Sequence, residues 1–145
     1  MRISQVLAGK ARADIVFVGP DESVRDLVAR LAEHNVGALV VSSDGSTLEG
    51  IVSERDVVRR LREDEALLDK PVSAIMTAEV RTCAETDRVN DLMLVMTEHR
   101  IRHLPVLRDG AMVGIISIGD VVKSRMSELE FERDQLDSYV HTAQT

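Results

Sequence analysis

The stretch GIVSERDVV at residues 50–58 decides the fold, because a close copy, GIISIGDVV, follows at residues 114–122. Each copy reads as the end of an apolar strand, then a serine, then the first turn of a helix with an aspartate three positions after the serine. The sequence before each copy repeats as well: VRDLV at 24–28 returns as VNDLM at 89–93. The chain therefore consists of two copies of one unit.

Each unit predicts the element order β-α-β-β-α. An extended segment precedes a helix with apolar residues at the i, i+3, i+4, i+7 spacing, and two short strands joined by a turn with Asp-Gly precede the second helix. The first unit covers residues 3–62, a linker lies at 63–71, the second unit covers 72–125, and a helical extension covers 126–145. A unit of about 60 residues buries little apolar surface alone, so we expect the two to form one pseudo-symmetric α/β module with a cleft.

The composition argues against several classes of function. Of the 145 residues, 44% are hydrophobic and 2% are aromatic, and the formal net charge is −7. Negative charge repels nucleic acids and anionic membrane surfaces, and few rings are present on which bases could stack. The single cysteine, Cys83, excludes an internal disulfide, and no apolar stretch reaches the roughly 20 residues of a membrane helix. We expect a cytoplasmic protein that binds neither nucleic acid nor membrane.

The repeated serine and aspartate allow two interpretations. Ser53 and Ser117 precede the predicted helices, and Asp56 and Asp120 follow three residues later. Such a pair caps a helix, because the hydroxyl accepts from free N–H groups and the carboxylate favours the positive end of the helix dipole. The same pair can present donors to a phosphate and a carboxylate to two vicinal sugar hydroxyls. Capping is the simpler interpretation of a single copy, but its recurrence in a cleft between matched halves favours ligand binding.

The motif resembles that of a known family. The pattern h-G-h-h-S-x-x-D (h, apolar), the segment RHLPV at 102–106 and the leader IMT at 75–77 are together similar to a tandem pair of CBS domains, or Bateman module. The resemblance covers residues 3–125 and implies two symmetry-related cavities for adenosine-containing ligands such as AMP, ADP, ATP, NAD or S-adenosylmethionine. In each cavity the aspartate of one repeat would meet the ribose, and strands of the other repeat would meet the base.

Carried onto this chain, the resemblance implies two sets of site residues. The first site joins Ser53, Arg55 and Asp56 to Met76, Thr77, Val80, Arg81, Ile101, Arg102 and His103. The second site joins Ser117, Gly119 and Asp120 to Ala11, Ile15, Val16, Val36, Gly37 and Ala38. Basic side chains of the first set are replaced by glycine and alanine in the second, so we expect phosphate to bind chiefly at the Asp56 site.

The other candidates for chemistry favour structural roles. His34 and His99 end the paired helices, where the negative end of the helix dipole stabilises a cation. Cys83 has no base that the sequence identifies, which favours a small buried residue. Since no metal-ligand spacing, P-loop or nucleophile motif occurs, we expect no metal site, no catalytic cofactor and no enzyme activity. Nucleotide hydrolysis or transfer with His103 as the base is a further alternative.

The last segment, SELEFERDQLDSYV at 127–140, contains no Gly or Pro and extends the final helix. Apolar residues follow a coiled-coil-like spacing along this helix: Val122, Met126, Leu129, Leu136 and Val140. Packing of the helix back onto its own module and self-association are the two interpretations. The resemblance to CBS pairs favours a homodimer.

The leading hypothesis is a non-catalytic regulatory module. It would bind AMP, ADP, ATP or NAD in the cleft between the repeats and signal to a regulated protein through a change of conformation or dimer geometry. The alternative is a structural or protein-interaction module whose cavities are empty.

Overall fold

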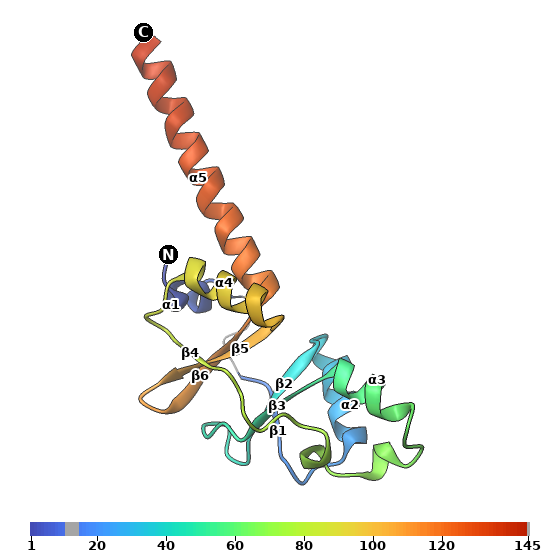
Figure 1. Ribbon diagram of the computed structural model, residues 1–145. Coiled ribbons are helices and arrows are strands. Elements are labelled where there is room, and N and C mark those ends of the chain that lie inside the picture. The colour runs from blue at the N-terminus through green and yellow to red at the C-terminus, as the bar shows by residue number, and fades with distance from the viewer. Residues whose placement is uncertain (11–14, 145) are drawn as a thin grey trace.

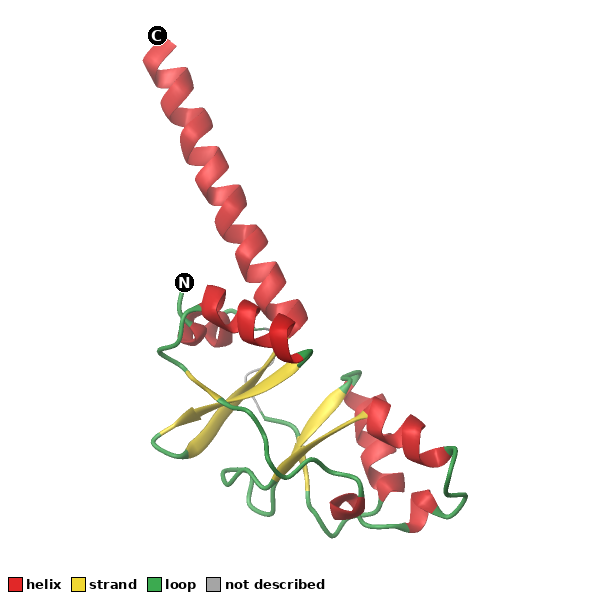
Figure 2. Ribbon diagram, in the orientation of Figure 1, coloured by secondary structure: helices red, strands yellow, loops and turns green. Residues whose placement is uncertain are grey.

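The computed structural model describes residues 1–10 and 15–144 and shows two three-stranded sheets, each covered by helices (Figures 1 and 2). In both sheets the first strand pairs in parallel with the second, and the second pairs antiparallel with the third. The first half contains β1 (Phe17–Val18), α2 (Val24–His34), β2 (Ala38–Val41), β3 (Gly50–Ser53) and α3 (Glu54–Leu61). The second half contains β4 (Cys83–Ala84), α4 (Val89–His99), β5 (His103–Arg108), β6 (Ala111–Ser117) and α5 (Ile118–Gln144). The predicted order β-α-β-β-α is confirmed in both halves.

The paired helices α2 and α4 end in the same way. The residue after each, Asn35 and Arg100, has a left-handed backbone with φ of 51° and 55° and donates its N–H to a carbonyl of the last turn. This conformation stops the helix and directs the chain into the next strand. His34 and His99 are the last helical residues, in agreement with the sequence-based prediction.

The two hairpins turn by different means. β5 and β6 are joined by Asp109 and Gly110, which both have positive φ, at 51° and 83°, as a two-residue type I′ turn requires. The longer β2–β3 connection is organised by Asp44, whose carboxylate accepts from the N–H groups of Thr47 at 2.7 Å and Ser46 at 2.8 Å. These bonds, that of Thr47 first, lower the pKa of Asp44 to about 2.

Short leader helices precede the two repeats, α1 (Ile3–Ala8) before the first and the 3₁₀ helix η2 (Val72–Ala74) before the second. Each leader packs in the half that is formed by the other repeat. Ile3 belongs to the core of the second half and Val72 to the core of the first, and neither has exposed surface. Backbone hydrogen bonds fix both, from Ile3 to Asp87 at 2.9 Å and from Val72 to Glu22 at 2.8 Å. Each half is therefore completed by a segment that belongs, in the sequence, to the other repeat.

The expected linker is also part of the fold. It contains a second 3₁₀ helix, η1 (Leu67–Asp69), and Leu67 is 1% exposed in the core of the first half. The segment thus packs against the unit it follows. Across the described residues, no helix is both long and apolar enough to cross a lipid bilayer.

The glycine of each repeated motif lies where a leader segment approaches the third strand. A Cβ at Gly50 would lie 2.9 Å from the carbonyl oxygen of Thr77, and a Cβ at Gly114 would lie 2.7 Å from Cδ2 of Leu7. The first contact is part of a backbone bridge, in which Ile51 and Thr77 exchange N–H···O bonds of 3.0 Å and 2.9 Å. Glycine permits this close approach at both places because it has no side chain.

α5 continues without a break through residues 125–126, where the sequence analysis places the end of the second repeat. Val121 in its first turn is fully buried in the second half, and Glu128 lies 3.5 Å from the amino group of Met1. Beyond this point the helix projects from the body (Figure 1). Leu136 is 65% exposed and Tyr139 is 74% exposed. The interpretation that the extension packs back on its own module is therefore wrong.

Two candidate ligand cavities between the halves

The repeated serine and aspartate form matching helix caps. At the start of α3, the Ser53 N–H donates to Oδ2 of Asp56 at 2.8 Å, and the Asp56 N–H donates to the Ser53 hydroxyl at 3.3 Å. At the start of α5, the Ser117 N–H donates to Oδ2 of Asp120 at 2.9 Å, and the Asp120 N–H donates to the Ser117 hydroxyl at 3.1 Å. The expected capping role is confirmed in both copies.

Capping leaves one oxygen of each carboxylate available. At Asp56 the N–H and the hydroxyl of Ser53 both donate to Oδ2, and at Asp120 the Ser117 N–H and Nζ of Lys10 both donate to Oδ2. Oδ1 of each can therefore accept from a hydroxyl donor without breaking the cap, since an ionised carboxylate has several acceptor positions. The two interpretations of the motif, capping and ligand binding, are compatible in one geometry.

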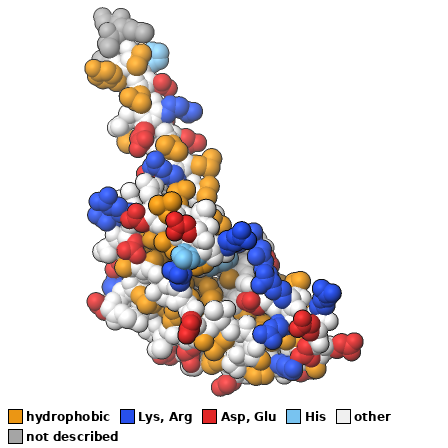
Figure 3. Space-filling model, in the orientation of Figure 1, with side chains coloured by type: hydrophobic (Ala, Val, Ile, Leu, Met, Phe, Trp, Pro, Cys, Tyr) orange, Lys and Arg blue, Asp and Glu red, His pale blue; other side chains and the backbone are white. Residues whose placement is uncertain are grey.

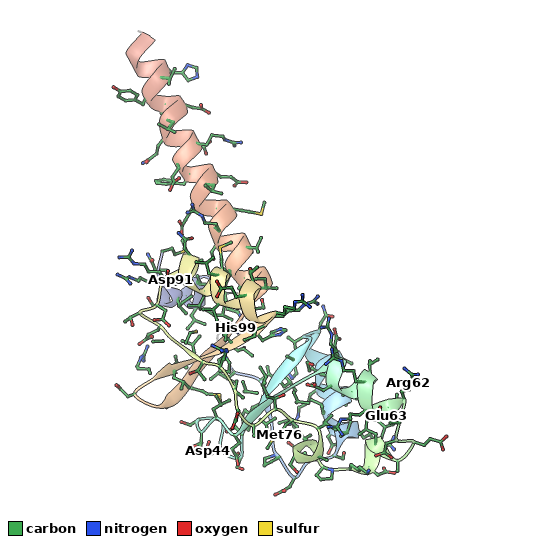
Figure 4. All side chains as sticks on the ribbon, viewed as in Figure 1. Asp44, Arg62, Glu63, Met76, Asp91 and His99 are labelled. Atoms are coloured by element: carbon green, nitrogen blue, oxygen red, sulfur yellow. The ribbon has the colours of Figure 1, made fainter. Side chains whose placement is uncertain are left out.

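The first cavity, the Asp56 cavity, has a volume of about 320 Å³ and is lined by both halves. Its lining consists of Gly37, Ala38, Ile51, Ser53, Glu54, Arg55, Asp56, Arg59, Thr77, Arg100, Ile101, Arg102 and His103. Seven residues of the first predicted set are among them. Three others of that set are not: Met76 packs against the core of the first half, Val80 is partly buried elsewhere, and Arg81 is exposed. Figure 4 shows Met76 beside the first sheet.

The second cavity, the Asp120 cavity, has a volume of about 390 Å³. Its lining consists of Lys10, Val16, His34, Asn35, Val36, Gly37, Ala38, Leu39, His103, Ile115, Ser117 and Asp120. Six residues of the second predicted set are among them. Gly119 is exposed and does not line the cavity, Ile15 lines a separate cavity, and Ala11 lies outside the described residues.

Two stretches of the chain, residues 4–63 and 72–127, match the CBS domain family. The chain belongs to this family. It is 36% identical over 146 residues to the CBS domain-containing protein CBSX3, mitochondrial, of Arabidopsis thaliana, an alignment covering 95% of this chain and 71% of the relative.

Two solved structures extend the comparison. The CBS-domain containing protein ATU1752 from Agrobacterium tumefaciens is 40% identical with a TM-score of 0.81, covering 86% of this chain and 99% of the other. The CBS domain protein PAE2072 from Pyrobaculum aerophilum, solved in complex with AMP, is 29% identical with a TM-score of 0.70, covering 83% of this chain and 89% of the other. The prediction of a tandem CBS pair is confirmed.

The two cavities of this CBS pair share a wall. Gly37, Ala38 and His103 line both, because Ala38 begins β2 and His103 begins β5 at equivalent places in the two sheets. Burial lowers the pKa of His103, an effect that nearby Asp120 opposes and Lys10 reinforces. The neutral imidazole is therefore favoured. From the sequence, His103 was expected in the first site alone.

Arginine side chains gather in the Asp56 cavity from both halves. Arg55 and Arg59 lie one turn apart on α3, and Arg100 and Arg102 come from the connection between α4 and β5. Figure 3 shows Lys and Arg side chains concentrated between the end of α4 and the start of α3. Sequence reasoning missed Arg59 and Arg100. The i, i+4 spacing of Arg55 and Arg59 was a usable signal for the former.

Lys10 is a third lining residue that was not predicted from the sequence. Its Nζ donates to Oδ2 of Asp120 at 2.9 Å and to the carbonyl oxygen of Ile115 at 2.8 Å. The pKa of Asp120 is lowered: burial acts to raise it, and the Ser117 N–H and Lys10 together outweigh burial. Asp120 is thus already neutralised by a lysine, whereas no cation of the described chain pairs with Asp56 within ion-pair distance.

The remaining reactive groups of the CBS pair have structural surroundings. Cys83 is 6% exposed and lies 3.7 Å from the carbonyl oxygen of Pro105, and burial raises the pKa of its thiol to about 12. The expected role of Cys83 as a small buried residue is confirmed. Within residues 1–10 and 15–144, no three His, Cys, Asp or Glu side chains are grouped as metal ligands would be.

Proposed function

We propose that the protein is a non-catalytic regulatory module that binds an adenosine-containing ligand, AMP, ADP, ATP or NAD, between its two CBS repeats. The observation that carries this proposal is the Asp56 cavity, where a carboxylate with an available oxygen faces arginines supplied by both halves. The AMP complex of the Pyrobaculum aerophilum relative supports an adenosine ligand.

Different lining residues would contact the ribose, the phosphates and the base of the ligand. Oδ1 of Asp56 would accept from the ribose hydroxyls, and the guanidinium groups of Arg55, Arg59 and Arg102 would bind phosphate oxygens. Ile51 and Ile101, from opposite halves, would contact the base. A ligand held in this way bonds both halves at once, and it shifts their relative packing to the extent that it binds one arrangement more tightly than another.

We also propose that the module forms a homodimer through its helices. Val58 on α3 is 68% exposed and Leu94 on α4 is 62% exposed, and a second copy would cover such apolar side chains. A change in the packing of the halves would then alter the dimer geometry and be passed to a regulated protein. The cytoplasmic location stays a prediction, and the name of the Arabidopsis relative places that protein in mitochondria.

A thermal-shift screen with AMP, ADP, ATP, NAD and S-adenosylmethionine tests ligand binding. A ligand at a hundred times its dissociation constant stabilises the folded state by about 2.7 kcal/mol. We expect such a shift with at least one of AMP, ADP, ATP and NAD in the wild type, and its loss in Asp56→Ala. The matched control is Asp91→Ala, because Asp91 is also an acidic residue in the first turn of a helix but lies away from both cavities (Figure 4).

Absence of any shift at millimolar ligand would contradict the proposal. It would favour the second candidate function, a protein-interaction module, for which the exposed apolar residues of α5 are the specific observation. In that case Asp56→Ala would leave partner binding unchanged and cost only the cap, about 0.5–2 kcal/mol of stability.

A further inference from the structure

The two cavities carry the same Ser/Asp motif but different charge. Among the described residues that line the Asp56 cavity, four arginines face two carboxylates, Glu54 and Asp56, which leaves a formal charge of +2 with histidine counted as neutral. Among the described residues that line the Asp120 cavity, Lys10 and Asp120 cancel, so their formal charge on the same count is zero. The difference is large for cavities of similar volume that share a wall.

The cation of the Asp120 cavity is also held in place. Two of the three N–H donors of Lys10 form hydrogen bonds, one to Asp120 and one to the carbonyl oxygen of Ile115. Its ammonium is therefore a structural partner of the carboxylate rather than an unpaired positive charge. His103, which this cavity shares with the other, is held toward its neutral form by burial.

Aliphatic side chains make up more of the Asp120 cavity. Val16, Val36, Leu39 and Ile115 line it together with Ala38, whereas the Asp56 cavity has Ile51, Ile101 and Ala38. The described lining of this cavity has no net positive charge, so a polyphosphate placed among its aliphatic groups loses hydration without compensation from that lining. A ligand without phosphate meets no such cost there, and Oδ1 of Asp120 remains available for its hydroxyls.

We propose that the two cavities take different classes of ligand: the Asp56 cavity binds a phosphorylated adenosine nucleotide, and the Asp120 cavity binds an unphosphorylated adenosine nucleoside. This inference rests on the proposed function, since it assigns ligand classes to the same two sites. It makes the module respond to two signals at once, with Gly37, Ala38 and His103 as the wall through which each ligand contacts the surroundings of the other.

Stoichiometry and salt dependence in the wild-type protein give the first test. Titration calorimetry and native mass spectrometry with ATP and adenosine as probes should show one ATP and one adenosine bound per chain at the same time. Raising NaCl from about 50 mM to about 500 mM should weaken ATP binding at least tenfold and adenosine binding less than twofold, because salt screens only the charged ligand. These measurements need no variant and do not depend on how a variant folds.

Charge-matched variants of α3 give the second test. Arg55→Gln with Arg59→Gln should weaken ATP binding at least tenfold. Arg60→Gln with Arg62→Gln removes the same charge from the last turn of α3 and its C-cap, at residues that do not line the cavity. It should change ATP binding less than twofold (Figure 4 shows Arg62 just beyond the outer end of α3). Equal losses in the two double variants would show that overall charge, and not the cavity, attracts ATP, and would overturn the assignment.

Asp120→Asn and Asp56→Asn assign the sites. Adenosine binding should weaken at least tenfold in Asp120→Asn, and ATP binding should weaken at least tenfold in Asp56→Asn. Two ATP molecules per chain, one of them lost in Asp120→Asn, would overturn the inference and leave the proposed function standing. ATP binding without adenosine binding at millimolar concentration would also overturn it, whereas binding of neither probe nor of any other adenosine ligand would contradict the proposed function itself.

Discussion

The first half of the CBS pair, built on β1, β2 and β3, and the second half, built on β4, β5 and β6, share a strand order and a motif but differ in what touches that motif. At Gly50 the nearest atoms are the backbone oxygen of Thr77 and the sulfur of Met76 in the crossing leader, and at Gly114 they belong to a leucine side chain. Asp56 faces arginines, and Asp120 is paired with Lys10. Duplication thus preserves backbone geometry, while the segments that cross between the halves make the two sites chemically different.

The exchange of leaders gives the largest expected effect. Ile3→Ala should lower the free energy of unfolding by about 2–5 kcal/mol, because it empties a fully buried position in the second half. Ile3→Val removes only one methylene and should cost about 0.5–1.5 kcal/mol. Urea unfolding of the two variants checks the graded loss. A cost below about 0.5 kcal/mol for Ile3→Ala would show that α1 does not complete the second core.

The two motif glycines should differ in their tolerance of alanine. Gly50→Ala pushes a Cβ against the carbonyl oxygen of Thr77, which is fixed by the bridge to Ile51, and should cost about 1–3 kcal/mol. Gly114→Ala meets Cδ2 of Leu7, which can change rotamer, and should cost less than Gly50→Ala. Thermal and urea unfolding of both variants measures the difference. The reverse order would contradict the assignment of the rigid crossing to the first half.

His103 should make stability depend on pH between about pH 7 and the lowered pKa of its imidazole. Because burial lowers this pKa in the folded state, the unfolded chain binds the proton first as the pH falls through about 6.5, and the free energy of unfolding decreases. The charged groups that face His103 are Asp120, Glu54, Lys10 and Arg102. His103→Gln should flatten the decrease in urea unfolding between about pH 7 and pH 5.5. An unchanged slope would exclude His103 as its source.

Removal of the projecting part of α5 should have the smallest effect on the fold. Residues 129–141 are exposed, so a chain ending at Glu128 should keep its free energy of unfolding within about 0.5 kcal/mol in dilute solution. Sedimentation velocity over a range of concentrations tests whether the same truncation weakens self-association. A large loss of stability in the dilute monomer would show that the extension contacts the module after all.

The local features of the fold followed from the sequence. The repeat of VRDLV and VNDLM placed both amphipathic helices, and the Asp-Gly pair at 109–110 placed the second hairpin turn. Ser53 and Ser117 were recognised as helix caps. These features depend on the spacing of residues close together in the sequence. Helices and strands have fixed side-chain periods, so this spacing predicts them directly.

Groupings that depend on distant segments were recovered only in part. The resemblance to CBS pairs brought Asp56 together with Arg102 and His103, and the structure does the same. It also placed Met76 and Arg81 in the first site, whereas Met76 packs into the core and Arg81 is exposed. A family pattern gives the path of the backbone, but the direction of each side chain depends on its own packing.

By itself, the sequence determined the two-unit architecture and the helix-capping Ser/Asp motif. It also determined that basic residues are concentrated near one copy of this motif. The tertiary structure alone decided that the leaders change places and that Lys10 neutralises Asp120. It also decided that His103 belongs to both cavities and that α5 leaves the body. The physical reason is that hydrogen bonding within a helix or turn is set by neighbouring residues, whereas the pairing of Lys10 with Asp120 requires the whole chain between them to fold first.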